Sequence, residues 1–171
     1  MKDMRSPYPW FGGKSAVASL IWQGFGDVPN YVEPFFGSGA VLLNRPQPFN
    51  GIETVNDING WLCNFWRALQ ADPDAVADYA DNPVSELDLH ARGDWLFYRE
   101  GVGDFIERLR SDPDYFDAKS AGWWVWGQCC WIGLAWGPRK LPHLGNAGMG
   151  VNRQLPHLGN AGMGVNRQLP H

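Results

Sequence analysis

The chain of 171 residues has few cysteines, no long apolar run and no acidic residue after position 117. Its three cysteines, Cys63, Cys129 and Cys130, form no C-x-x-C pair, which argues against a disulfide framework or a metal site of that type and favours the cytoplasm. The first residues contain no long apolar stretch, and the Trp-rich run 121–137 is interrupted by polar and glycine residues. We therefore expect neither a secretory signal nor a membrane span.

Charge is unevenly distributed. The net charge is −4 overall, made up of zero over residues 1–71, −9 over 72–117 and +5 over 118–171. This balance argues against a wholly basic DNA-binding module. We interpret the acidic segment as solvated surface, whereas the basic C-terminal part could attract phosphates in a salt-dependent manner.

The sequence Y-V-E-P-F-F-G-S-G-A-V-L-L-N at residues 31–44 predicts a strand, a glycine turn and a short helix over residues 40–43. Gly37 and Gly39 suit a tight turn, because glycine tolerates positive φ and lets a ligand approach the backbone. Leu42 stands where a dinucleotide fingerprint needs its third small residue, which disfavours nicotinamide and flavin dinucleotides. A turn that only ends a strand remains an alternative at this point.

A second predicted strand, 52–55, leads to Asp57, twenty residues after Gly37. An acidic residue at this distance is suited to holding ribose hydroxyls.

Three motifs together resemble the D12, Dam-like class of adenine-specific DNA N6-methyltransferases. They are W-x-G-G-K at residues 10–14, V-E-P-F-x-G-x-G at 32–39 and N-D-x-N at 56–59, in the order of that family. The resemblance is clearest over residues 5 to about 70 and weaker over 118–137.

The resemblance implies S-adenosylmethionine as cofactor, with Trp10 and Lys14 at its methionine end and Asp57 at its ribose. Lysine can hold a carboxylate, and an aromatic face attracts the sulfonium cation. The full set of cofactor-binding residues expected from the resemblance is Trp10, Lys14, Glu33, Pro34, Phe35, Gly37, Gly39 and Asp57. Taken singly, Trp10 could be a core aromatic and Lys14 a surface charge.

The resemblance also implies an α/β fold of the Rossmann-like, S-adenosylmethionine-dependent type. The family's catalytic D-P-P-Y segment is not found, so we predict no catalytic residues in this chain, a fold incomplete at its C-terminal side, and a sheet with an unpaired apolar edge. We expect a partial methyltransferase domain at 1–137 and a Gly/Asn/Pro-rich tail at 138–171. No metal site is expected.

The sequence S-D-P-D-Y at residues 111–115 approaches the catalytic motif but has Asp114 in place of its second proline. It precedes the Trp-rich segment and lacks an apolar strand before it. We interpret it as a helix start, because Ser or Asp followed by Pro is typical there.

Helices are predicted at 60–69, packed on the sheet and ended by Asp72-Pro73, and at 74–79 and 102–109, with polar loops around 82–83 and 92–94. The Trp-rich run 118–137 resembles the helix before the family's catalytic strand. One face of it, with Trp123, Trp124, Gly127 and Trp131, is expected to be buried. A stacking platform for unpaired bases is a minor alternative, because no Lys or Arg lies between Gly122 and Gly137.

From residue 141 the sequence L-P-H-L-G-N-A-G-M-G-V-N-R-Q occurs twice in succession. It has too few large apolar groups to build a core, so we expect loop or disorder. Repetition explains the spacing of His143, His157 and His171 better than metal binding.

By resemblance, the predicted function is transfer of a methyl group from S-adenosylmethionine to adenine N6 in double-stranded DNA, in a bacterial or phage-infected cell. We expect the isolated chain to be inactive. The alternatives are a non-catalytic cofactor- or DNA-binding module completed by a partner chain, and a decayed, truncated product. RNA or protein methylation is less expected.

Overall fold

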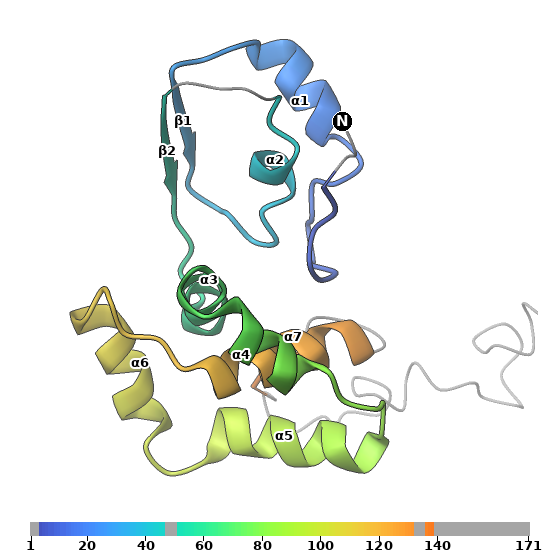
Figure 1. Ribbon diagram of the computed structural model, residues 1–171, viewed down its shortest axis with the longest axis vertical. Coiled ribbons are helices and arrows are strands. Elements are labelled where there is room, and N and C mark those ends of the chain that lie inside the picture. Colours follow the sequence, from blue (N-terminus) through green and yellow to red (C-terminus); the bar gives the residue numbers. More distant parts are fainter. Residues whose placement is uncertain (1–3, 47–50, 132–135, 139–171) are drawn as a thin grey trace, which may run out of the picture. The chain divides into compact units, whose positions relative to one another are not determined.

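The computed structural model describes residues 4–46, 51–131 and 136–138 (Figure 1). The chain divides into two units, Met1–Trp136 and Gly137–His171. The 14-residue repeat and its histidines lie outside the described residues. The predicted domain boundary after residue 137 therefore stays a prediction.

The described elements alternate between strands and helices at first and are then helical. In chain order they are α1 (Ala18–Phe25), β1 (Asn30–Glu33), α2 (Ala40–Leu43), β2 (Ile52–Val55), α3 (Gly60–Ala71), α4 (Pro73–Ala80), α5 (Glu86–Tyr98), α6 (Val102–Ser111) and α7 (Ala118–Cys130). The predicted strand 52–55 and helix 40–43 are confirmed.

Strands β1 and β2 pair in parallel, with Tyr31 opposite Glu53 and Val32 opposite Thr54. On β1, Tyr31 and Glu33 are buried, whereas all four residues of β2 are exposed. The exposed side chains include Val32 and Ile52, with 57% and 67% of their surface accessible. Since parallel sheets are normally covered on both faces, this pair has the character of part of a larger sheet. The described residues thus show an α/β arrangement of two strands, and the Rossmann-like fold stays a prediction.

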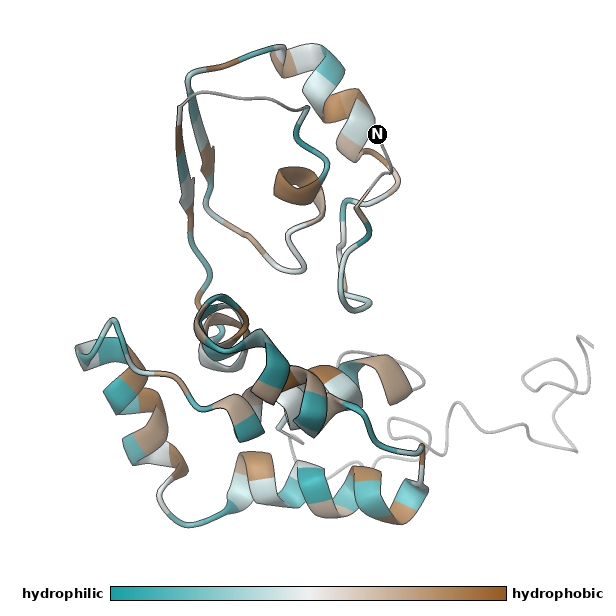
Figure 2. Cartoon of the chain, in the orientation of Figure 1, coloured by the Kyte–Doolittle hydropathy of each residue, from teal (hydrophilic) through white to brown (hydrophobic). Residues whose placement is uncertain are grey.

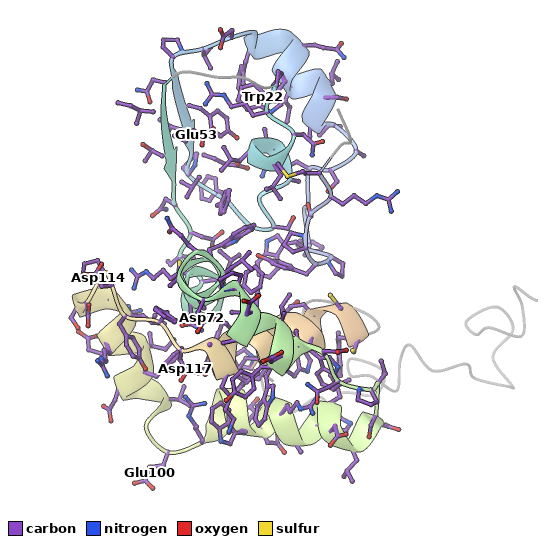
Figure 3. The ribbon with its side chains drawn as sticks, viewed as in Figure 1. Trp22, Glu53, Asp72, Glu100, Asp114 and Asp117 are labelled. Carbon is purple, nitrogen blue, oxygen red and sulfur yellow. The ribbon has the colours of Figure 1, made fainter. Side chains whose placement is uncertain are left out.

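A small apolar cluster of Trp22, Tyr31 and Val41 joins α1, β1 and α2. The indole N–H of Trp22 donates a hydrogen bond of 2.7 Å to the carbonyl of Val41. Beside it, the buried Arg45 pairs with Glu53 at 3.1 Å, and its guanidinium lies 5.2 Å from the Trp22 ring centre (Figure 3). Helices α1 and α2 are thereby held to the two strands.

The helical region has its own core, in which α7 contacts α3, α4 and α5 (Figure 1). Trp124 of α7 is 1% exposed. Helix α7 is anchored at its first turn, where the buried Asn64 exchanges two hydrogen bonds with the backbone of Asp117. The Asp117 carboxylate in turn caps α7 by accepting from the N–H of Ser120. Gly122 lets α4 approach, because a Cβ there would overlap the Cβ of Tyr79.

Two sequence-based expectations for the helices are corrected first. The predicted loop at 92–94 is wrong, because these residues lie inside α5, where Gly93 faces the ring of Trp136. The predicted helix 60–69 exists as α3, yet it packs chiefly on α4, α6 and α7 rather than on the sheet.

The expected buried face of the Trp-rich helix is correct only in part. Trp124 and Gly127 are buried, whereas Trp123 and Trp131 are partly exposed. Trp126, which was not expected in the core, is 4% exposed. The indole N–H of Trp126 finds the carbonyl of Asn82 at 2.8 Å, and this hydrogen bond makes its burial tolerable.

Within the described ranges, no helix has the length and apolar character needed to cross a bilayer. The same residues contain no group of three or more His, Cys, Asp or Glu side chains placed to hold a metal ion. All three cysteines are free thiols.

Candidate functional site

A pocket of about 250 Å³ lies where the N-terminal segment, the turn after β1 and the residue after β2 meet. Its walls consist of Trp10, Phe11, Gly12, Gly13, Lys14, Glu33, Phe35, Phe36, Gly37, Ser38, Ala40 and Asp57. Six of the eight residues predicted for cofactor binding are therefore brought together. The other two, Pro34 and Gly39, do not line the pocket.

The two glycines of the turn have different tasks. Both adopt the left-handed conformation that their sequence pattern predicts, with φ of 54° at Gly37 and 67° at Gly39. A Cβ at Gly37 would lie 2.7 Å from the Trp10 ring, so glycine lets this indole rest on the backbone at the pocket wall. A Cβ at Gly39 would instead approach the rings of Phe36 and Trp66. Gly37 therefore shapes the pocket, and Gly39 serves packing.

Asp57 holds the turn in place. One of its carboxylate oxygens accepts the N–H of Gly37 at 2.9 Å, and the other accepts the N–H of Asn59 at 3.0 Å. Asn59 in turn caps α3, accepting from the N–H groups of Trp61 and Leu62. A carboxylate offers about four acceptor positions, so Asp57 retains capacity for a further donor. Its predicted contact with ribose stays a prediction.

Lys14 and Glu33 place opposite charges side by side in the pocket wall. The Lys14 Nζ lies 3.7 Å from a carboxylate oxygen of Glu33 and donates to the carbonyl of Phe35 at 3.3 Å. Glu33 is only 6% exposed, and its other oxygen accepts the Tyr31 hydroxyl at 2.8 Å. Burial, together with this hydrogen bond to an anion, raises the pKa of Tyr31. The sequence motifs contained Lys14 and Glu33 but gave no sign that they pair.

Sequence reasoning missed two residues behind the pocket. The Tyr8 hydroxyl and the Trp66 indole N–H both donate to the carbonyl of Gly37, at 3.0 and 3.3 Å. The Tyr8 ring also packs edge-on against Trp10 and Trp124, and burial raises the pKa of its hydroxyl. Tyr8 stands two residues before the motif that begins at Trp10, whereas nothing in the sequence indicated Trp66.

A family model for the D12 class N6 adenine-specific DNA methyltransferases matches residues 10–118, more than half of the chain. The chain belongs to this family.

Individual relatives agree with the family match. The chain is 34% identical over 76 residues to a DNA N-6-adenine-methyltransferase of Escherichia phage P1, which covers 44% of this chain and 10% of the relative. It is 36% identical over 75 residues to a DNA adenine methylase of Vibrio cholerae, covering 44% and 26% of the two proteins. A type II methyltransferase of Methanocaldococcus jannaschii, M.MjaIII, is 27% identical over 134 residues, or 73% of this chain and 45% of the relative. The chain thus spans less than half the length of these curated relatives.

The segment 111–115 of this D12 chain does not belong to the pocket. Helix α6 ends at Ser111, and the Asp112 carboxylate accepts from the N–H of Asp114 in a tight turn. Tyr115 packs against Phe105, with the Arg108 guanidinium 4.0 Å from its ring centre. The interpretation of this segment as a helix start is therefore wrong, because it is a helix end followed by a turn. None of its residues lines the pocket, and the absence of catalytic residues stays a prediction.

Proposed function

We propose that the pocket binds S-adenosylmethionine, and that the chain provides the cofactor-binding part of an adenine-specific DNA methyltransferase with a Rossmann-like core. The observation that supports this best is the Lys14–Glu33 pair beside Trp10 and the left-handed turn at Gly37, all in one pocket of a D12 chain. The cofactor supplies the methyl group, which its sulfonium makes electrophilic.

The charges of the pocket fit the methionine end of the cofactor, which carries an α-carboxylate and an α-ammonium group. We assign Lys14 to the carboxylate and Glu33 to the ammonium, because the two side chains present opposite charges 3.7 Å apart. Trp10 and Phe35 offer aromatic faces to the sulfonium. The free acceptor positions of Asp57 suit the ribose hydroxyls.

The size of the pocket supports partial enclosure. At about 250 Å³ it is slightly smaller than the roughly 300 to 1,000 Å³ of ordinary ligand sites. We infer that the pocket holds one end of the cofactor.

For the complete reaction we propose methyl transfer to adenine N6 in double-stranded DNA, with the base turned out of the duplex. This step needs a catalytic segment, and the 171 residues contain no D-P-P-Y. The segment would come from outside these residues, either in the same polypeptide or in another. We therefore expect no methyl transfer by the 171-residue chain alone, and labelled N6-methyladenine formed by the purified chain would refute this.

A second candidate is a non-catalytic module that binds cofactor or DNA and is completed by a separate chain. The edge position of β2 in the described two-stranded sheet favours it, since a further strand would satisfy the backbone groups of β2 that face away from β1. Co-purification of a second polypeptide whose crosslinks map to β2 would support this candidate. A decayed product would instead be insoluble or lack cooperative unfolding.

The cofactor proposal is tested by calorimetric titration with S-adenosylmethionine, comparing the wild-type chain with Lys14→Gln. Asp57→Ala is a poorer probe, because it also removes the acceptors for the N–H groups of Gly37 and Asn59. Lys14 has 43% of its side chain exposed and makes one hydrogen bond to a carbonyl, so its loss disturbs the turn less. Lys119→Gln, which removes the same charge from outside the pocket, is the matched control.

We expect saturable binding by the wild type and by Lys119→Gln, and binding weakened at least about tenfold in Lys14→Gln, as for loss of one charged hydrogen bond. Thermal unfolding of each variant checks that the fold is intact. Absence of binding by well-folded wild-type chain would show that the family relationship does not extend to a working cofactor site here.

A further inference from the structure

Helices α5 and α7 bring together two tryptophans and two cations outside the pocket. The Arg99 guanidinium lies 3.7 Å from the ring centre of Trp95, and the Lys119 Nζ lies 4.5 Å from the ring centres of both Trp95 and Trp123. The two indoles meet edge to face, with centroids 5.0 Å apart. We call these four residues the cation–indole surface.

Helical spacing explains how the surface forms. Lys119 and Trp123 are four residues apart on α7 and share one face of that helix, while Arg99, the residue that caps the C-terminus of α5, lies four residues after Trp95. All four side chains are partly exposed. The sequence alone did not indicate this surface. The contact of Lys119 with Trp95 depends on how α5 and α7 pack, because the two residues are more than twenty positions apart in the chain.

A third cation, Arg92, also lies on a tryptophan ring, but its contacts are with buried residues and stabilise the fold. Its guanidinium lies 4.3 Å from the ring centre of the buried Trp126 and donates to the side-chain oxygen of Asn82 at 2.9 Å. Its Nη1 is covered and finds no acceptor among the described residues. We therefore leave Arg92 out of the cation–indole surface.

The charges around the two partly exposed cations are unusual, because residues 72–117 carry thirteen acidic side chains. Within the part of the chain that the structure describes, no carboxylate lies within 4 Å of Arg99 or Lys119. The contrast with α6 is clear, since Arg108 lies 3.9 Å from Asp112 and Arg110 lies 3.8 Å from Glu107. Among the described residues, the Arg99 side chain makes one hydrogen bond, a long one of 3.4 Å to the carbonyl of Trp95.

Indole faces hold long cationic side chains in place without neutralising them. A Lys or Arg side chain loses much rotamer freedom when it binds a ligand, and prior ordering on an aromatic ring reduces that loss. The result is a pair of positive charges, ordered and still rich in N–H donors. Such a pair suits anionic groups spaced along a chain, as phosphates are.

We propose that the cation–indole surface contacts the phosphate backbone of DNA, outside the cofactor pocket. The choice of DNA rests on the proposed function, whereas the affinity for phosphates rests on the geometry of the four residues. Base stacking on the tryptophans fits less well, because the Trp95 ring already carries two cations.

The test measures binding of a short fluorescent DNA duplex by anisotropy, without cofactor, to the full chain. The variant Arg99→Gln/Lys119→Gln is compared with Arg108→Gln/Arg110→Gln, which removes the same charge from α6. If both cations contact phosphates, the plot of log K against log salt is less steep in the first variant than in the wild type, by about two in slope. Equivalently, between about 50 and 200 mM salt the wild type loses about tenfold more affinity than this variant. The α6 variant keeps the wild-type slope.

A second variant guards against an effect on folding. Arg99→Lys/Lys119→Arg keeps both charges, so we expect it to retain the affinity and the salt slope of the wild type. Equal DNA binding by the wild type and Arg99→Gln/Lys119→Gln would overturn the proposal. An effect confined to single-stranded DNA would overturn it too, because it would indicate base stacking instead of backbone contact.

Failure of this proposal is separable from failure of the cofactor proposal. Arg99→Gln/Lys119→Gln should bind S-adenosylmethionine as the wild type does, whereas Lys14→Gln should keep its DNA affinity and bind the cofactor at least about tenfold more weakly. A chain that binds cofactor but whose DNA affinity does not depend on Arg99 and Lys119 would refute only the role of the cation–indole surface.

Discussion

The α/β region and the helical region of the chain are stabilised to very different extents. Among the described residues, the cluster around Trp22, Tyr31 and Val41 has three buried apolar residues, whereas the core built on the helices has sixteen, with Tyr8 of the N-terminal segment among them. Apolar burial is the main stabilising contribution in a folded protein, so the helical region should unfold last. In Figure 2 the apolar colour of α2 contrasts with the mixed colours of α5, whose length lets one face be buried while the other stays polar.

The proposed cofactor pocket belongs to the weaker region and is tied to the stronger one by aromatic side chains. Tyr8 and Trp66 donate to the carbonyl of Gly37, and the Tyr8 ring packs against Trp124. We infer that the helical core supports the pocket through these aromatic residues, while β2 stays open for whatever completes the sheet. We thus infer that the helical region supports the pocket, whereas the α/β region supplies most of its walls.

Among the changes considered, removal of the Trp124 ring should lower stability most. Trp124→Ala in the helical core is expected to lower the free energy of unfolding by about 3 to 5 kcal/mol, because a large buried ring is replaced by a cavity. Val41→Ala, in the small cluster, should cost about 2 kcal/mol. Urea titrations followed by circular dichroism measure both. Equal losses in the two variants would show that the regions are not stabilised differently.

Adding a methyl group between α4 and α7 should have the next largest effect on stability. A Cβ at Gly122 would lie 2.7 Å from the carbonyl oxygen of Val76 as well as against Tyr79, so Gly122→Ala must push backbone apart and should cost about 2 to 3 kcal/mol. Gly103→Ala on α6 meets no atom within 4 Å and should raise stability by about 0.5 to 1 kcal/mol. Thermal melts of the pair report the difference. A neutral Gly122→Ala would mean that α4 and α7 pack more loosely than the structure has them.

The turn at Gly37 provides a third, smaller test, directed at the pocket. Gly37→Ala and Gly101→Ala both place alanine at positive φ, where the left-handed conformation costs about 1 to 2 kcal/mol. Only at Gly37 does the new methyl group meet a neighbour, the Trp10 ring at 2.7 Å. We therefore expect similar stability losses and a selective loss of S-adenosylmethionine affinity in Gly37→Ala. Equal cofactor affinity in the two variants would show that the position of Trp10 does not matter to binding.

The sequence predicted the local elements of the α/β region well. The strand 52–55, the helix 40–43 and the left-handed turn at Gly37 and Gly39 were all readable, because each depends on neighbours within a few residues. Six of the eight predicted site residues line one pocket for the same reason, since their motifs fix the segments that form its walls.

Packing between distant segments was not readable. Gly93 suggested a loop, yet it lies within α5 where Trp136 packs against it. The cations that accompany the tryptophans of α7 were sought within residues 122–137, but Lys119 in the first turn of α7 and Arg92 of α5 supply them. The double role of Asp57 was also hidden, because its bonds to Gly37 and Asn59 follow from the turn geometry and not from the motif.

High pH should reduce the stability contribution of Tyr8, which joins the two regions, and this is the smallest of the expected effects. Burial raises the pKa of Tyr8 above its ordinary value near 10, so the folded chain keeps this proton after the unfolded chain has lost it. The contribution is complete below pH 10 and is lost as the pH rises above it, by about 1.4 kcal/mol per pH unit. In Tyr8→Phe this slope is absent, although the variant is less stable at neutral pH because the hydrogen bond to Gly37 is missing. Denaturant midpoints of the wild type and Tyr8→Phe should therefore converge above pH 10, since all other titrating groups cancel in the difference. Parallel midpoints across this range would mean that Tyr8 is solvated in the native state, and that the pocket is not held to the helical core through it.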